Sequence, residues 1–105
     1  MTDAYGNPSS FHSEGKKAKD AIDAARTSVA GVLGAHADEI LFTSGGTESD
    51  NLAVLGIARA QGKGHIIAST IEHQAVMESV VHLEKKEGFE VTYVPVDKLG
   101  VVNPD

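Results

Sequence analysis

The sequence predicts a doubly wound α/β fold built on a mainly parallel sheet. Helical and strand-like segments alternate along the chain, in the order helix, strand, helix, strand, helix, strand. Strands that alternate with helices pair in parallel through right-handed crossovers. The 105 residues, of which 41% are hydrophobic and 11 are glycines, suffice for one small domain.

The first predicted helix and strand follow a turn-rich stretch at residues 1–12. Ser13 can cap the helix and Gly34 can end it. Its apolar residues recur at spacings of three and four and would form one face: Ala18, Ile22, Ala25, Val29 and Val32. The segment EILFT, residues 39–43, is short and apolar and is followed by glycines. It is predicted to be a buried strand.

The second helix is expected from Thr47 to about Arg59, before glycines 62 and 64. The segment HIIAS, residues 65–69, is predicted to be a second short buried strand.

A third helix and a third strand complete the pattern. Ser69 and Glu72 fit a capping box, in which each side chain satisfies the other residue's free backbone N–H group. The apolar face of this helix would carry Val76, Val80 and Leu83, and the helix would end at Gly88. The segment FEVTYVPV, residues 89–96, is rich in β-branched and aromatic residues and is predicted to be a strand.

Charge and composition exclude several classes of function. The formal net charge of −6 disfavours nucleic acid and an anionic membrane surface as partners. The sequence has no cysteine, which excludes disulfides and cysteine metal sites within it. No apolar run is long enough to span a membrane and the N-terminus has no apolar signal core. The expected compartment is the cytoplasm.

The stretch TSGGTESDN, residues 43–51, is the first candidate site. Ligands of such sheets bind at the carboxyl ends of the strands, and a helix N-terminus offers free N–H donors and a partial positive charge. This suggests a phosphate seat at Gly45, Gly46 and Thr47. The alternative, slightly favoured by the local pattern, is that the glycines only form the turn, while Thr47 caps the helix and Asp50 completes a capping box. Glu48 would compete with a phosphate unless its carboxylate points away.

His73 is the second candidate, expected in the first turn of the third helix. An imidazole at a strand end can stack on a flat ligand or relay a proton. Taken alone, a histidine on a solvated first turn is the more common case. The other histidines show no spacing that gathers a metal site, and are expected at the surface or in loops: His12, His36, His65 and His82.

Two further polar residues have modest expected roles. Asn51 lies one helical turn after Thr47 and would contact a ligand or, more commonly, the neighbouring loop. Arg26, beside the apolar face of the first helix, is expected to form an ion pair.

These segments together resemble one enzyme family. The combination consists of GNPSSFH at 6–12, Gly15, Ala25-Arg26, EILFTSGGTESDNLA at 39–53, HIIAS at 65–69, Glu72-His73 and GFEVTYVPVD at 88–97. In this order it resembles the N-terminal part of cysteine desulfurases, in the class V aminotransferase group of fold-type-I pyridoxal-phosphate (PLP) enzymes. The resemblance covers almost the whole chain, which would be a fragment of the PLP-binding large domain, residues 1–105, with no second domain.

The resemblance implies a ligand-binding role for Gly46, Thr47 and His73, which reverses the preference of the local patterns for purely structural roles. The turn matching Gly46 and Thr47 would hold the cofactor phosphate, and the histidine matching His73 would stack on the pyridine ring and assist proton transfers. The family reaction converts L-cysteine to L-alanine and leaves a persulfide on an enzyme cysteine, for iron–sulfur cluster assembly or other sulfur transfer. One departure is Gly46, where the family more often has alanine.

The resemblance also implies that much of the site lies elsewhere. The lysine that forms the Schiff base, the aspartate at the pyridine nitrogen and the persulfide cysteine would all lie beyond residue 105. The chain alone is therefore expected to be inactive. The remainder of the parent chain, or a second chain, would complete the sheet, and the family is typically homodimeric.

Family topology predicts the behaviour of the isolated chain. The strand matching 40–43 would lie near one sheet edge, and four strands from later sequence would separate it from the other two. At about 4.8 Å per strand this leaves a gap of roughly 24 Å. The chain purified alone should then be unfolded, self-associated or repacked. Two other functions remain open: a selenocysteine lyase or another class V aminotransferase, and a truncated non-catalytic module.

Overall fold

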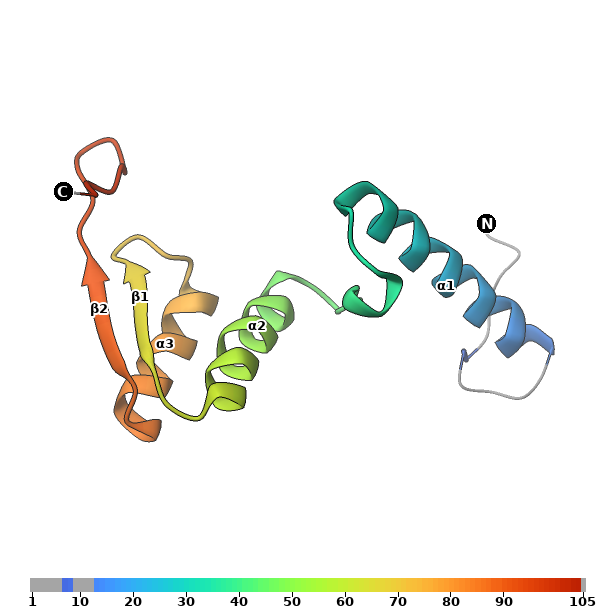
Figure 1. Cartoon of the computed structure of the whole chain (residues 1–105), viewed down its shortest axis with the longest axis horizontal. Helices are drawn as coiled ribbons and strands as arrows, with labels where there is room; N and C mark the ends of the chain where they lie inside the picture. The colour runs from blue at the N-terminus through green and yellow to red at the C-terminus, as the bar shows by residue number, and fades with distance from the viewer. Residues whose placement is uncertain (1–6, 9–12, 105) are drawn as a thin grey trace. The chain divides into compact units, whose positions relative to one another are not determined.

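The structure is a computed structural model that describes residues 7–8 and 13–104 (Figure 1). The chain divides into two units, Met1–Phe42 and Thr43–Asp105. Of the GNPSSFH motif at 6–12, only Asn7 and Pro8 lie within the described residues, so the expected roles of this motif and of His12 are outside them.

The first unit is built on one long helix, α1 (Ser13–Leu33). Ser13 is itself helical, so the prediction that it caps the helix is wrong. The predicted end is confirmed, because Gly34 takes a φ of 67° and the Ala35 amide donates to the Ala30 carbonyl at 3.0 Å. A residue without a Cβ adopts this left-handed conformation without strain, which explains why the helix stops there.

The predicted apolar face of α1 is not a buried face. Ala18 is 8% exposed, but Ile22, Val29 and Val32 are 36%, 40% and 88% exposed. Among the described residues, the only other helical element of this unit is the 3-10 turn η1 (Ala37–Glu39), which is too short to cover a helix of 21 residues. The spacing of the apolar residues therefore predicted the helix correctly, but most of these residues are not buried.

The predicted buried strand at 39–43 is wrong. Residues 40–45 have no regular structure, and Leu41 and Phe42 are 65% and 48% exposed. A strand exists only through its ladder of hydrogen bonds to a neighbour, and neither described strand pairs with this segment.

The second unit contains α2 (Gly46–Gln61), β1 (His65–Ser69), α3 (Gln74–Glu87) and β2 (Glu90–Val94). Strands β1 and β2 are parallel neighbours, with His65 opposite Glu90 and Ser69 opposite Val94. The described fold is therefore a mixed α/β arrangement with two parallel strands, joined through α3. Beyond β2, Val96 forms an isolated antiparallel bridge with Val102, so the third strand is shorter than predicted.

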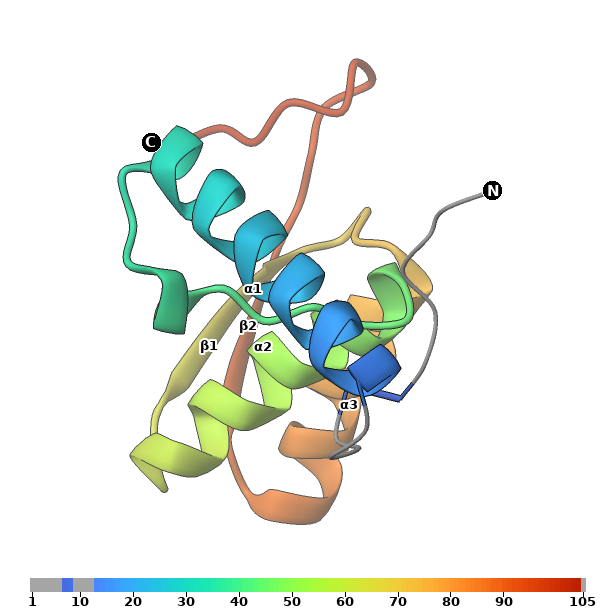
Figure 2. The same cartoon turned by 90° about the vertical axis from the view of Figure 1, so that its right-hand side faces the viewer.

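Both helices of this unit lie on one side of the two strands (Figures 1 and 2). The small core contains Leu83, Ala58 and Phe89, which are 0%, 9% and 8% exposed. Burial alternates along β1, where Ala68 is buried and Ile67 is 69% exposed. The prediction that β1 is fully buried is wrong, because helices cover only one face of this sheet.

The start of α3 also differs from the prediction. The helix begins at Gln74, and its N-cap is His73, not Ser69. The Ser69 hydroxyl does donate to the Glu72 carboxylate at 2.8 Å, but this bond joins the end of β1 to the loop before the helix. At the other end Gly88, with a φ of 75°, ends α3 as predicted.

Candidate functional site

Helices α2 and α3 run parallel, with their N-termini at the same end of the pair. Asn51 on α2 bonds to Ser79 on α3, and Arg59 on α2 bonds to Glu87 on α3. In each pair the two residues are 28 positions apart. An equal offset at two points along the helices requires the same direction and register. The loop after β1 leads directly into α3, so this end of the pair lies at the carboxyl end of β1 (Figure 1). The helix pair therefore brings the two predicted site segments to one end of the unit.

The first segment is the corner at the start of α2. Gly45 is the N-cap, and the first helical bond runs from the Ser49 amide to the Gly45 carbonyl at 3.1 Å. The amides of Gly46, Thr47 and Glu48 precede this bond and have no helical carbonyl to donate to. Thr47 lies within the helix, so the alternative in which Thr47 and Asp50 form a capping box is wrong. Free amides at a helix N-terminus are suited to a phosphate.

The backbone of the corner requires neither glycine. Gly45 is extended, with a φ of 167° and a ψ of −179°, and Gly46 has no positive φ. A Cβ added to either residue would meet no atom within 4 Å. An alanine at position 46 would therefore fit without a clash.

The Glu48 carboxylate is held by the residue before the corner. It accepts hydrogen bonds from the Ser44 hydroxyl and from the Ser44 amide, the latter at 2.8 Å. These bonds lower the pKa of Glu48, the hydroxyl contributing most. The Thr43 and Ser49 hydroxyls meet at 2.6 Å beside them. Glu48 is thus engaged by Ser44, and an anion at the corner would still lie close to its negative charge.

The second segment is centred on His73. Its Nδ1 accepts a hydrogen bond from the Ala75 amide at 3.1 Å, which caps α3 and fixes the ring. The sequence had placed His73 in the first turn of α3, and this is wrong: His73 precedes the helix. The residue is exposed, and Nε2 is the ring nitrogen that the cap does not use. Free amides on α2 and an oriented imidazole on α3 are chemically suited to a phosphate and an aromatic ring, respectively.

The expected contact between Asn51 and the neighbouring loop is replaced by bonds to two helices. Its Nδ2 donates to the Thr47 carbonyl at 2.8 Å, and its Oδ1 accepts from the Ser79 hydroxyl at 2.5 Å. Ser79 is 2% exposed and did not stand out in the sequence. No sequence signal marks this pair, because its two residues lie 28 positions apart on different helices.

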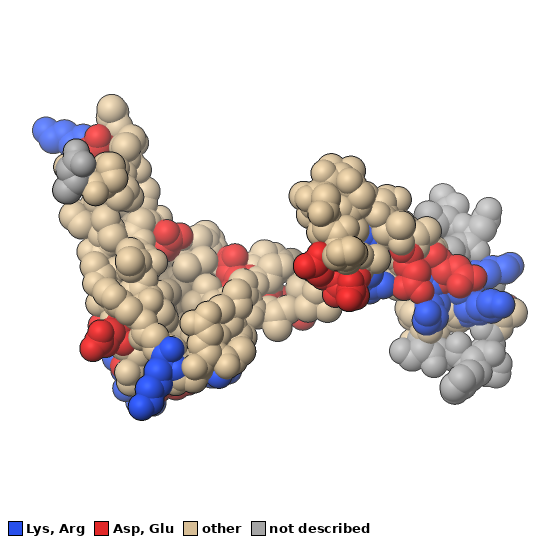
Figure 3. Space-filling model, viewed as in Figure 1, with Lys and Arg blue, Asp and Glu red and all other residues tan. Residues whose placement is uncertain are grey.

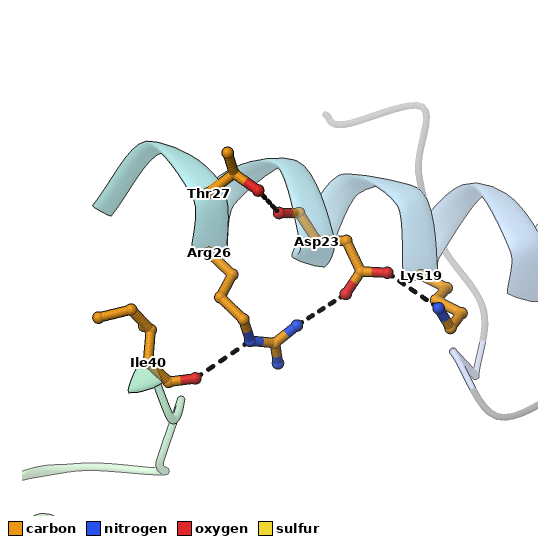
Figure 4. A network of polar contacts seen from close by, with 5 residues as sticks. All are labelled: Lys19, Asp23, Arg26, Thr27 and Ile40. Atoms are coloured by element: carbon orange, nitrogen blue, oxygen red, sulfur yellow. Dashed lines mark hydrogen bonds and ion pairs between the residues drawn. The ribbon is translucent and has the colours of Figure 1, made fainter. Parts of the chain in front are cut away.

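The ion pair expected for Arg26 is confirmed in the first unit (Figure 4). The Arg26 guanidinium lies 2.7 Å from the Asp23 carboxylate and donates through Nε to the Ile40 carbonyl at 3.1 Å. It also lies 5.5 Å from the centroid of the Phe42 ring. Arg26 therefore fastens the segment after η1 to α1.

The described histidines lie apart from one another along the chain. No group of three or more metal-binding side chains is found within residues 7–8 and 13–104. His36 lies in a loop, His65 contacts the Thr92 hydroxyl at 2.7 Å, and His82 lies 3.2 Å from Glu87. All three are exposed.

Basic side chains gather where α2 and α3 end (Figure 3). The last turn of α2 holds Arg59, and the last turn of α3 holds Lys85 and Lys86. Cations are favourable at helix C-termini.

Among the described helices, none is long and apolar enough to cross a membrane.

Comparison with known proteins identifies the family. The family model described as "Aminotransferase class-V" matches residues 1–105. The chain belongs to the class-V aminotransferase family. It is similar to "Cysteine desulfurase IscS" of Methanosarcina thermophila, with 57% identity over 108 residues, all of this chain and 26% of the relative. The Dictyoglomus turgidum protein of the same name is 52% identical, over all of this chain and 27% of its own length.

Solved structures agree with this assignment. A "NIFS-like protein" matches with a TM-score of 0.84 and 46% identity over 96% of this chain and 28% of its own. DndA from Streptomyces lividans matches with a TM-score of 0.71 and 44% identity, over 85% of this chain and 25% of its own. The chain spans about a quarter of the length of these relatives, and it contains no cysteine.

Proposed function

We propose that this chain supplies one wall of the PLP site of a cysteine desulfurase. Gly46 and Thr47 would bind the cofactor phosphate, and His73 would lie against the pyridine ring. The reaction would convert L-cysteine to L-alanine and pass the sulfur to an enzyme cysteine as a persulfide, for iron–sulfur cluster assembly or other sulfur transfer. The parallel pairing of α2 and α3 supports this proposal most directly, because it brings the free amides and the imidazole to one end of the unit.

Each residue would contribute through ordinary chemistry. The amides of Gly46 and Thr47 and the Thr47 hydroxyl would donate hydrogen bonds to phosphate oxygens, at the positive end of the α2 dipole. His73 would hold or move a proton at Nε2, because Nδ1 is engaged by the Ala75 amide. The cofactor, when bound, supplies an electron sink for the substrate.

Other parts of the enzyme would come from outside this sequence. The Schiff-base lysine, the aspartate at the pyridine nitrogen and the persulfide cysteine are proposed to lie on the remainder of the parent chain or on a second chain that completes the sheet. We place the enzyme in the cytoplasm as a homodimer, without nucleic acid or membrane as partner. The chain mixed alone with PLP should show no stoichiometric Schiff-base absorbance that survives dialysis.

A chimera tests the proposal. Residues 1–105 would replace the matching quarter of the Methanosarcina thermophila relative, and binding of PLP and release of sulfide from cysteine would be measured. Thr47→Val should weaken PLP binding by about 2 kcal/mol, or about 30-fold, because it removes a hydrogen bond to a charged group. Binding of pyridoxal, which has no phosphate, should change little. Thr92→Val, in which the lost hydroxyl contacts His65 on β1, is the matched control.

His73→Ala should lower turnover by about a hundredfold or more, as expected for loss of a proton-transfer group. A folded chimera that binds PLP no better than pyridoxal would contradict the phosphate assignment. A folded chimera that binds neither compound would favour a non-catalytic module. Faster turnover of selenocysteine than of cysteine would favour a selenocysteine lyase.

A further inference from the structure

Hydrogen bonds and one turn of α3 join the two site segments. The Thr47 carbonyl accepts from Asn51 Nδ2 at 2.8 Å, and Asn51 Oδ1 accepts from the Ser79 hydroxyl at 2.5 Å. One turn before Ser79 on α3 is Ala75, whose carbonyl lies 3.1 Å from the same hydroxyl and whose amide donates to His73 Nδ1 at 3.1 Å. The path therefore runs from the phosphate corner to the imidazole through two side chains.

We propose that Asn51 and Ser79 are positioning residues that fix the Gly46–Thr47 corner relative to the His73 ring. This inference rests on the proposed function. Neither side chain needs to touch a ligand: Asn51 acts through the Thr47 carbonyl, and Ser79 acts through the turn of α3 that His73 caps.

Burial supports a demanding role for this pair. Ser79 is 2% exposed, so its hydroxyl has lost its water. A buried hydroxyl without a partner is costly, whereas one that bonds to a fixed partner orients both groups. The Asn51 amide uses its donor on its own helix and its acceptor on the next helix. A change at either residue should therefore be felt at both ends of the path.

The second link between the same helices provides a matched control. Arg59 donates to Glu87 at 2.6 Å near the C-terminal ends of α2 and α3, away from the site. Arg59→Gln weakens the helix pair without touching the path between Thr47 and His73. A merely structural role of Asn51 and Ser79 would give the same result as Arg59→Gln.

The first measurement uses the chimera with PLP and pyridoxal as probes. The ratio of their dissociation constants isolates the phosphate contribution. Asn51→Ala and Ser79→Ala should each reduce the preference for PLP about tenfold, which corresponds to the loss of about one hydrogen bond. The double variant should be little worse than either single variant, because the two residues act as one unit. Arg59→Gln should leave the ratio unchanged.

The second measurement follows the 105-residue chain by NMR, with inorganic phosphate as probe. Phosphate should shift the amides of Gly46 and Thr47 and, through the path, the Ala75 amide and the His73 ring. In Ser79→Ala the shifts at Ala75 and His73 should disappear while those at the corner remain. If phosphate shifts no corner amide, the proposed function fails. The inference is then decided by whether Ser79→Ala alone perturbs both Thr47 and His73.

Equal effects of Ser79→Ala and Arg59→Gln on the PLP preference would overturn the inference. An additive loss in the double variant would overturn it as well. If the isolated chain gives no resolved spectrum, the ratio measured in the chimera decides the question.

Discussion

Truncation of Leu83 should remove at least a third of the stability of the second unit. Its side chain is fully buried between Ala58 and Phe89, the two other members of the small core. Leu→Ala at such a site loses the transfer free energy of the removed atoms and leaves a cavity, which together cost about 3 kcal/mol. A unit of about 60 residues has a free energy of unfolding of roughly 3–9 kcal/mol. Leu83→Ala should therefore remove between a third and all of it.

Urea unfolding followed by circular dichroism measures this effect. With a slope of about 1 kcal/mol per molar urea, the midpoint should fall by about 3 M. Leu99→Ala is the matched control, because Leu99 is 87% exposed and its truncation should change the free energy of unfolding by less than about 0.5 kcal/mol. Equal shifts for the two variants would refute the assignment of Leu83 to a core.

Three further predictions concern the ends of the helices and the first unit. The hydrogen bond from Arg59 lowers the pKa of Glu87 in the folded protein. The stability that Glu87 contributes is therefore present above its ordinary pKa of 4.5 and is lost as the pH falls through the lower folded pKa. Glu87→Gln should flatten the dependence of the thermal midpoint on pH below about 4.5, and an unchanged curve would contradict this. Gly88→Ala should lower the free energy of unfolding in urea by about 1 kcal/mol, because Gly88 has a left-handed φ of 75°. Gly46→Ala should lower it little, because Gly46 has no positive φ and a Cβ there meets no atom within 4 Å. Equal losses for the two variants would contradict the backbone argument. Arg26→Ala should release the segment after η1 and speed its cleavage in limited proteolysis, while Arg26→Lys, which keeps the charge, should have a smaller effect. Cleavage of Arg26→Ala at the rate of the unchanged protein would contradict this role of Arg26.

Local signals were sufficient for the helices and for one pair of strands. Gly34 and Gly88 end their helices because a left-handed residue is required at those points, and this requirement is visible in the sequence. The segment HIIAS forms a strand over the predicted residues 65–69. Its pairing with β2 follows from the helix between them, since a strand–helix–strand unit pairs in parallel.

Properties that depend on distant partners were not predictable in this way. The segment at 39–43 has the composition of a strand, but a ladder needs a neighbour, and none of the described strands supplies one. The cap of α3 depends on a choice between Ser69 and His73 that only the chain path decides. The bond between Asn51 and Ser79 joins residues 28 positions apart, which no local pattern contains.

The two links between α2 and α3 also restrict how the length of this chain can change. One residue added to α2 between Asn51 and Arg59 would turn everything after it by about 100°, since a helix has 3.6 residues per turn. Only one of the two links could then form. An insertion in the turn at 62–64 leaves both helices intact and is absorbed there. Substitutions can accumulate along these helices, but growth and shortening of the sequence must be confined to the turns between them.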